Sequence, residues 1–254
     1  FRILNYWIIL KFIFVHRSLA YGGNYVKAAI GQRPMDKNEF QNIKLLDNSE
    51  VSLISDRAEA ITEAAFHPLY IGPVKNEIKV QYNLEAIDHR LLNEDLGVFP
   101  NSNDLKISVD TTRILGSLRE SLPYPPPPPL SASQRNSKKY LPPWNIKAYP
   151  VFLKNISLDT LIIGHGEFFH LMIEAKDSLG KWKPIQQPYI YFCGFGLTDF
   201  YLAPGEIALS SCKLFKGDYQ TQMRLVFRSK KKIYSNEFKA RMNYDQFKKP
   251  EDDG

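Results

Sequence analysis

Apolar and polar residues alternate at every second position over much of this chain. In EIKVQYNLE (77–85) the apolar residues fall at even-numbered positions, and in LKISVDT (105–111) they fall at odd-numbered positions from Leu105 to Val109. Successive side chains of a strand point to opposite faces, so this period of two predicts strands with one buried and one wet face.

The same pattern becomes dense and regular beyond Tyr149. Turn residues such as Pro204-Gly205 and Gly217-Asp218 separate the apolar runs at intervals of roughly 8 to 12 residues, which is typical of a sandwich or barrel. The strands predicted here are 148–155, 160–164, 167–177, 182–185, 188–194, 200–202, 206–214, 219–227, 233–235 and 238–244.

The first twenty residues, FRILNYWIILKFIFVHRSLA, have a different character. They are mainly apolar, carry cations at Arg2, Lys11 and Arg17 but no acid, and end in Ser18-Leu19-Ala20. Small residues at these last positions fit a signal-peptidase site, so residues 1–20 are interpreted as an export signal that forms a leader helix. An uncleaved membrane anchor and a buried amphipathic helix are the alternatives.

Residues 21–76 show little periodicity and are predicted to be an irregular N-terminal segment. One short helix is expected near 56–66, with Asp56 as its N-cap and Pro68 ending the pattern. His67 follows this helix directly and is expected to be a capping or surface residue.

A proline-rich segment at 123–144 interrupts the strand pattern. Its five consecutive prolines, Pro125 to Pro129, favour an extended spacer without backbone donors. We expect an insertion into a β-sandwich that spans 77–244, followed by a polar tail at 245–254. A docking ligand for an aromatic groove is the alternative interpretation of the prolines.

Charge gives little support to a nucleic-acid partner. The chain has 33 Lys and Arg against 27 Asp and Glu. Because the leader holds three of the basic residues and no acid, the remainder carries a net charge of only +3. The sharpest basic cluster, Arg228 to Lys232, lies between two predicted strands and is expected to be a solvated hairpin tip.

Two stretches carry a resemblance to a known group of proteins. LAPGEIAL followed by FKGDYQTQMRLVF looks like the penultimate hairpin of bacterial immunoglobulin-like sandwiches, and KNISLDTLIIGHGEFFHLMIEAKDSLGKWKPI extends the match. Over about residues 148–244 the chain resembles exported bacterial proteins of no assigned activity. The resemblance implies an immunoglobulin-like fold, an exported precursor and no catalytic residues, and it does not reach residues 21–147.

The stretch GHGEFFH (164–170) is the most suggestive sign of chemistry. A zinc-protease helix needs two histidines four residues apart with a glutamate directly after the first, whereas the spacing here is His165, Glu167 and His170. On a helix this spacing leaves the two imidazoles roughly 140° apart, and on a strand, which the pattern favours, His165 and His170 face opposite sides, so the two rings are expected to diverge. A weaker metal site, with His165 and Glu167 joined by a third ligand, stays open. No cofactor is predicted.

Cysteines and aromatic residues supply the other candidate positions. Cys193 and Cys212 could form a disulfide in an oxidising compartment, or they could be two separate buried thiols. An exposed aromatic surface could bind a partner chain or a sugar ring, although these side chains could equally pack within the fold. Its candidate residues are Tyr189, Tyr191, Trp182 and Trp144.

Two functions from different classes follow from these observations. The first is a non-catalytic exported sandwich that binds or assembles a protein or glycan at the cell envelope, contacting the membrane only through its leader. The second is a carbohydrate-active or other hydrolase whose carboxylates lie in loops. A eukaryotic glycoprotein, suggested by the sequon Asn155-Ile156-Ser157, is a third and more distant interpretation.

Overall fold

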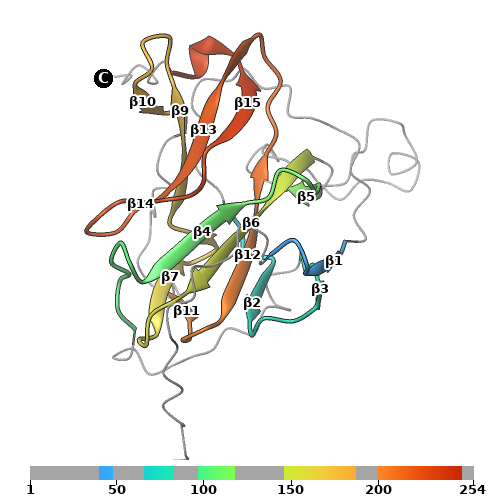
Figure 1. The fold of residues 1–254 in the computed structure, drawn as a ribbon, viewed down its shortest axis with the longest axis vertical. Coiled ribbons are helices and arrows are strands. Elements are labelled where there is room, and N and C mark those ends of the chain that lie inside the picture. Colours follow the sequence, from blue (N-terminus) through green and yellow to red (C-terminus); the bar gives the residue numbers. More distant parts are fainter. Residues whose placement is uncertain (1–39, 48–65, 83–96, 118–145, 187–198, 248–254) are drawn as a thin grey trace, which may run out of the picture. The chain divides into compact units, whose positions relative to one another are not determined.

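The computed structural model describes residues 40–47, 66–82, 97–117, 146–186 and 199–247, all within one compact unit, Asn38–Gly254. This part of the chain is mainly β and contains, besides its strands, only a short 3-10 helix at Tyr244–Phe247 (Figure 1). The described strands are β1 (Lys44–Leu46), β2 (Tyr70–Gly72), β3 (Glu77–Lys79), β4 (Leu105–Val109), β5 (Leu115–Ser117), β6 (Ile146–Asn155), β7 (Leu161–His165), β8 (Phe168–Phe169), β9 (Leu171–Lys176), β10 (Trp182–Pro184), β11 (Asp199–Leu202), β12 (Ile207–Lys213), β13 (Tyr219–Phe227), β14 (Ile233–Tyr234) and β15 (Phe238–Met242).

The first antiparallel sheet is built around the long strand β6. Its order is β2-β12-β6-β4, and β5 also pairs with β6, beyond the end of β4 (Figure 1). Pro150 lies within β6 although proline lacks a backbone donor. Its carbonyl accepts a hydrogen bond from Asp110 N. Because the N and C=O of one strand residue point to the same side, the nitrogen of Pro150 faces the gap between β5 and β4, the two strands that pair with this side of β6. A missing donor costs least at such a break in the ladder.

The second layer combines two antiparallel groups of strands, β10-β9-β13-β14 with β15 on β13, and β11-β7-β8. The two groups meet at His170, which lies between β8 and β9. Its backbone nitrogen donates to Ile163 O at 3.1 Å, and its carbonyl accepts from Arg228 N at 2.9 Å. Backbone hydrogen bonding is therefore continuous from β7 to β13 through a single residue.

A common apolar core holds the two layers together. It contains Leu105, Val151 and Ala208 from the first sheet together with Ile173 and Leu225 from the second, all buried. On β8 and β9 the odd-numbered side chains from 169 to 175 belong to this core. Two antiparallel layers around one core are consistent with a β-sandwich.

The outer face of the first sheet is also covered. Phe152 points away from the common core, yet it is fully buried because the ring of Phe40 stacks on it at 4.6 Å with an interplanar angle of 7°. Strand β1 follows Phe40 and pairs in parallel with β3. Because β1 and β2 have three residues each, a periodic pattern is too short to reveal them within 21–76.

Several predicted strands are confirmed with small shifts of their ends. LKISVDT gives β4, the run 148–155 gives β6, and 219–227 gives β13 with the same bounds. In EIKVQYNLE, by contrast, Glu77–Lys79 is the only strand among the described residues 77–82. The leader helix and residues 56–65 of the short helix lie outside the described residues, and no helix in the described ranges is long and apolar enough to cross a membrane.

The prediction that His67 is a capping or surface residue is wrong. It is buried, its ring lies 4.6 Å from the ring of Phe168, and its carbonyl accepts a hydrogen bond from Ser210 Oγ. Burial in this apolar setting, helped by the positive charge of Lys213, lowers the pKa of His67 to about 4. The imidazole is therefore neutral in the folded protein near pH 7.

We predict that Gly217→Ala destabilises the fold by at least about 2 kcal/mol, as an over-packed interior would. A Cβ at this position would lie 2.0 Å from the backbone carbon of Met242, which cannot move without shifting β15. Gly205→Ala is the control, because Gly205 has open space and only the strain of its positive φ, about 1 kcal/mol. Urea denaturation measures both. Equal losses in the two variants would contradict the close approach.

We predict that acidification weakens the fold through His67. The folded pKa lies below the unfolded one, so the unfolded chain takes up more protons, and stability is lost as the pH falls from about 6.5 to about 4. The expected contribution is about 3 kcal/mol. Urea denaturation of the wild type and His67→Gln at pH 7, 5.5 and 4.5 tests this. The variant should have the shallower profile, whereas parallel profiles would refute the assignment.

Candidate binding site

The stretch GHGEFFH forms a tight hairpin. Strands β7 and β8 pair antiparallel, with His165 opposite Phe168, and the two-residue turn between them contains Gly166 at a φ of 62° and the exposed Glu167. A glycine at positive φ is typical of such turns. The stretch therefore forms strands rather than the helix of a zinc protease.

The expected divergence of the two imidazoles is wrong. Residues that face each other across a hairpin share a face, so the turn restarts the alternation and places His165 and His170 on one side. Burial lowers the pKa of His170 first, and the charge of nearby His165 lowers it further, while Asp199 opposes both. Near neutral pH His170 is uncharged, and its ring stacks on Phe99 with centroids 6.2 Å apart.

His165 has a partner that the sequence did not reveal. Strand β11 places Asp199 directly opposite His165, and the Nδ1 and Oδ1 atoms lie 2.5 Å apart. Glu167 points into solvent from the turn. In the described part of the chain no group of three or more His, Cys, Asp or Glu side chains is arranged to hold a metal ion. His165 is thus paired with Asp199 while Glu167 lies exposed in the turn, and in the described ranges these two weak metal candidates belong to no group of three ligands.

Trp182 takes part in an intramolecular network on the outer face of β9, β13 and β14. The guanidinium of Arg224 lies 4.1 Å from the Trp182 ring centre and 3.9 Å from that of Tyr234, and Lys176 lies 4.7 Å from the Trp182 ring. The buried carboxylate of Glu174 accepts two hydrogen bonds from Arg224. Cation–π contact and ion pairing thus give Trp182 a packing role in the sheet.

Of the other residues singled out in the sequence, Cys212 and Asn155 are described by the structure. Cys212 is a free, buried cysteine, and burial raises the pKa of its thiol to about 12. Asn155 of the sequon is fully buried and donates its amide to Leu202 O and Asp159 O, so it has a structural role. Tyr189, Tyr191, Trp144 and Cys193 lie outside the described residues.

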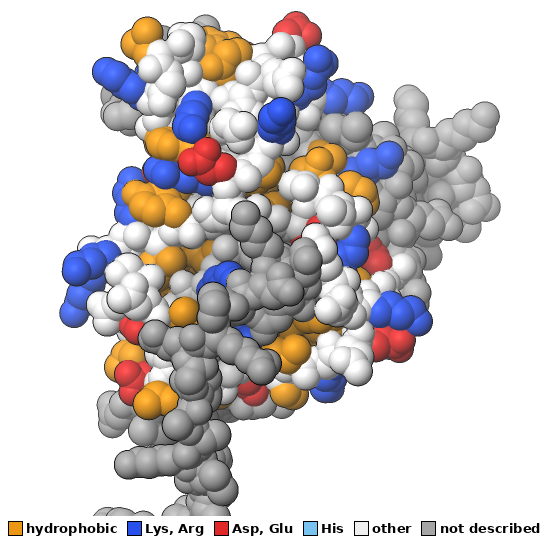
Figure 2. Space-filling model, in the orientation of Figure 1, with side chains coloured by type: hydrophobic (Ala, Val, Ile, Leu, Met, Phe, Trp, Pro, Cys, Tyr) orange, Lys and Arg blue, Asp and Glu red, His pale blue; other side chains and the backbone are white. Residues whose placement is uncertain are grey.

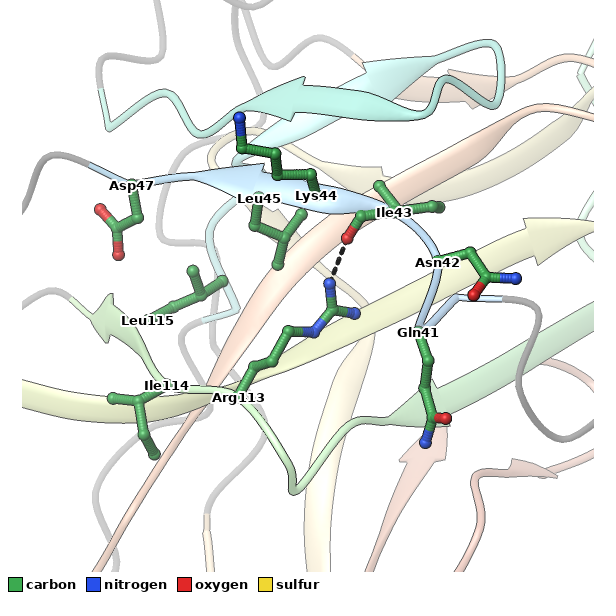
Figure 3. Close-up of a pocket in the computed structure, with 9 residues that line it drawn as sticks. All are labelled: Gln41, Asn42, Ile43, Lys44, Leu45, Asp47, Arg113, Ile114 and Leu115. Carbon is green, nitrogen blue, oxygen red and sulfur yellow. Dashed lines mark hydrogen bonds between the residues drawn. The ribbon is translucent and has the colours of Figure 1, made fainter.

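One hollow of about 450 Å³ lies where residues 41–47 approach the β4–β5 connection (Figure 3). Arg113 crosses this space, and its guanidinium donates to Ile43 O, to Phe40 O at 2.8 Å and to Asp110 Oδ2 at 2.5 Å. It also lies 5.5 Å from the centre of the Phe152 ring. With several of its donors engaged within the protein, Arg113 fastens the N-terminal segment to the sheet.

The carboxylate of Asp110 completes this fastening. Burial alone would raise its pKa, but hydrogen bonds from the side chain and backbone of Thr112 and from Arg113 outweigh that effect and lower the pKa. Asp110 therefore stays ionised at neutral pH and holds the guanidinium in place. Arg113 and Asp110 therefore bind each other, and Arg113 binds the backbone of residues 40–43, which gives both a structural role without a ligand.

A second hollow, of about 270 Å³, lies where β15 approaches the ends of β6 and β12, and we call it the β15 groove. Its aromatic residues are Tyr149, Phe215 and Phe238, and the rings of Tyr149 and Phe238 meet edge to face at 6.1 Å. No acidic residue is among its described lining. The described lining is Tyr149, Lys213, Leu214, Phe215, Gln220, Met223, Phe238, Lys239, Ala240 and Arg241.

The charged residues of the β15 groove lining are all positive: Lys213, Lys239 and Arg241. They belong to a stretch, 213–243, that has nine Lys and Arg residues against two acids, although several of these lie at the distant β13–β14 connection. Figure 2 shows Lys and Arg side chains around β13 and β15 with few acids among them. Lys239 and Arg241 are exposed and have no ion pair among the described residues.

Comparison with protein-family models, with curated proteins and with solved structures finds no match for this chain. The geometry of the described residues is therefore the basis for the functional argument. Within it, the β15 groove places Lys239 and Arg241, which have no ion pair among the described residues, beside a group of aromatic side chains.

We predict that Arg113→Lys loosens the segment at 40–47, because an ammonium cannot donate to three separated acceptors as the planar guanidinium does. The expected loss is about 2 kcal/mol in urea denaturation, with faster amide exchange in peptides that cover 40–47. Arg228→Lys, at an exposed position of the β13–β14 connection, is the control. Unchanged exchange in the Arg113 variant would contradict the fastening role.

Proposed function

We propose that this protein is a non-catalytic, exported β-sandwich of immunoglobulin-like type that binds a partner or helps an assembly form at the bacterial cell envelope. Export and the immunoglobulin-like type rest on the N-terminal leader and on the resemblance of residues 148–244. The binding role rests on the β15 groove. In this proposal the partner presents negative charge to the groove.

The observation that carries the proposal is the composition of the groove. Two exposed cations, Lys239 and Arg241, lie beside an aromatic floor, and neither has an ion pair among the described residues. Cations held close together at a surface repel one another, and an acidic ligand relieves that repulsion. The aromatic floor adds apolar contact area, which such an interface needs for affinity.

The described carboxylates support a binding role over catalysis, because internal contacts occupy many of them. Glu174 pairs with Arg224 and Lys232, Asp110 pairs with Arg113, and Asp177 accepts from two backbone amides of its turn. A glycosidase needs two carboxylates across a shared cleft, separated by roughly 5 to 10 Å. These acids instead stabilise turns and sheet faces.

A hydrolase is the second candidate, and one observation favours it. His165 and Asp199 form the Asp–His contact that orients a general base in several hydrolases, and both side chains are about one-third exposed. A nucleophile beside this pair would be needed for that chemistry. The β15 groove, with its concentrated charge, gives the binding function the stronger physical basis.

We predict that the full chain binds a fluorescein-labelled deca-glutamate peptide in fluorescence anisotropy at low salt. Lys239→Glu/Arg241→Glu should weaken binding about ten-fold or more, because two attractive contacts become repulsive. Lys230→Glu/Lys231→Glu, at the exposed hairpin tip, changes the net charge equally and is the matched control. It should retain most of the affinity.

Two results would overturn this proposal. Equal losses in both double variants would show general attraction to net positive charge rather than a site. Equal or tighter binding of a ten-residue oligothymidine would show a preference for nucleic acid. Thermal unfolding of each variant ensures that lost binding does not reflect lost folding.

A further inference from the structure

The β15 groove lies beside a sheet edge. Strand β15 pairs with β13 through all five of its residues, from Phe238 opposite Met223 to Met242 opposite Tyr219. On its other side, no strand of the described ranges pairs with it. Alternate residues of an edge strand direct their N–H and C=O groups outward, where another chain can bond to them.

The side chains of β15 alternate in chemistry as well as direction. Phe238 and Met242 are buried in the common core and Ala240 packs against it, whereas Lys239 and Arg241 are exposed. A strand added beside β15 would follow the same alternation, because residues opposite each other in a sheet share a face. One set of its side chains would enter the aromatic groove, and the other would meet the two cations.

From this geometry we infer that the partner binds as an added β-strand, an extended segment in which acidic and apolar residues alternate. This inference rests on the proposed function and specifies the partner. Its acidic residues would pair with Lys239 and Arg241, and its apolar residues would contact the floor formed by Tyr149, Phe215 and Phe238. Backbone hydrogen bonds to β15 would supply the remaining contacts.

The same cations argue against a second copy of this chain as the occupant. Two β15 edges that paired with each other would bring Lys239 and Arg241 of one copy close to the same residues of the other. Like charges on facing strands destabilise a sheet, and exposed lysines on edge strands commonly prevent such self-association. An acidic strand turns this repulsion into attraction.

Three labelled peptides test the inference on the full chain: alternating Glu-Val of nine residues, the same peptide with every Val N-methylated, and the same peptide with every Glu N-methylated. In a strand all Val amides point to one edge and all Glu amides to the other. One methylated peptide should therefore lose at least ten-fold in affinity while the other binds nearly as the parent. Equal binding of all three would overturn strand addition.

A charge swap checks the proposed contacts from the protein side. Lys239→Glu/Arg241→Glu should lose the Glu-Val peptide and gain an alternating Lys-Val peptide, whereas Lys230→Glu/Lys231→Glu should gain little. No gain in the first variant, or an equal gain in both, would overturn the assignment of these contacts.

The proposed binding function and the added β-strand are tested separately by these peptides. If deca-glutamate binds through the groove but the methylated peptides behave alike, the binding function stands and strand addition falls. If no acidic peptide binds, both fall. Slower amide exchange in the peptide covering 238–242, seen with bound Glu-Val and absent with bound deca-glutamate, would support the added strand independently.

Discussion

Face-to-face packing of two antiparallel layers across one apolar core is the constraint on which the rest of this structure depends. Each layer gives one face to that core, through residues such as Val151 and Leu225. Polar groups are thereby confined to the outer faces and the edges. The burial of many apolar side chains outweighs the conformational entropy lost on ordering, so short strands at the periphery can be tolerated.

The outer faces of the two layers are covered by different side chains. On the first sheet, Phe40 and Arg113 cover the Phe152 ring, so a distant N-terminal segment completes the layer. On the second, Arg224 bridges aromatic rings and a buried carboxylate across three strands. In both cases the contact uses an arginine, because a flat guanidinium can stack on a ring and donate several hydrogen bonds at the same time, which a lysine cannot do. The guanidinium groups of Arg113 and Arg224 are therefore engaged in contacts within the protein.

Sequence patterns were informative wherever structure is decided locally. Period-two alternation identified β4, β6 and β13, and turn residues marked most of the boundaries between them. The pattern did not identify β1 or β2, because three residues give no measurable period and their pairing partners lie far away in the chain. Nor could it place His67 in the interior, since that depends on Phe168 being brought against it.

In the candidate site too, the sequence indicated features set by neighbouring residues but not those set by pairing between distant strands. The count of alternate positions failed at His165 and His170 because a two-residue turn reverses the chain between them. Asp199 beside His165 and the meeting of β15 with the ends of β6 and β12 both arise from strand pairing that one sequence does not encode visibly. Lys213, Lys239 and Arg241 were visible in the sequence, but their position around one groove was not.

The pairing of Ser117 with Ile146 has a consequence for how this chain can vary. The backbone leaves the first sheet and re-enters it at adjacent positions, so the ends of the intervening connection are held together by the sheet itself. The entropy of closing a flexible chain between two fixed points rises only logarithmically, by about 0.6 kcal/mol for each doubling of its length. Because the sheet fixes both of these points, a change in the length of chain between them carries little closure cost of its own.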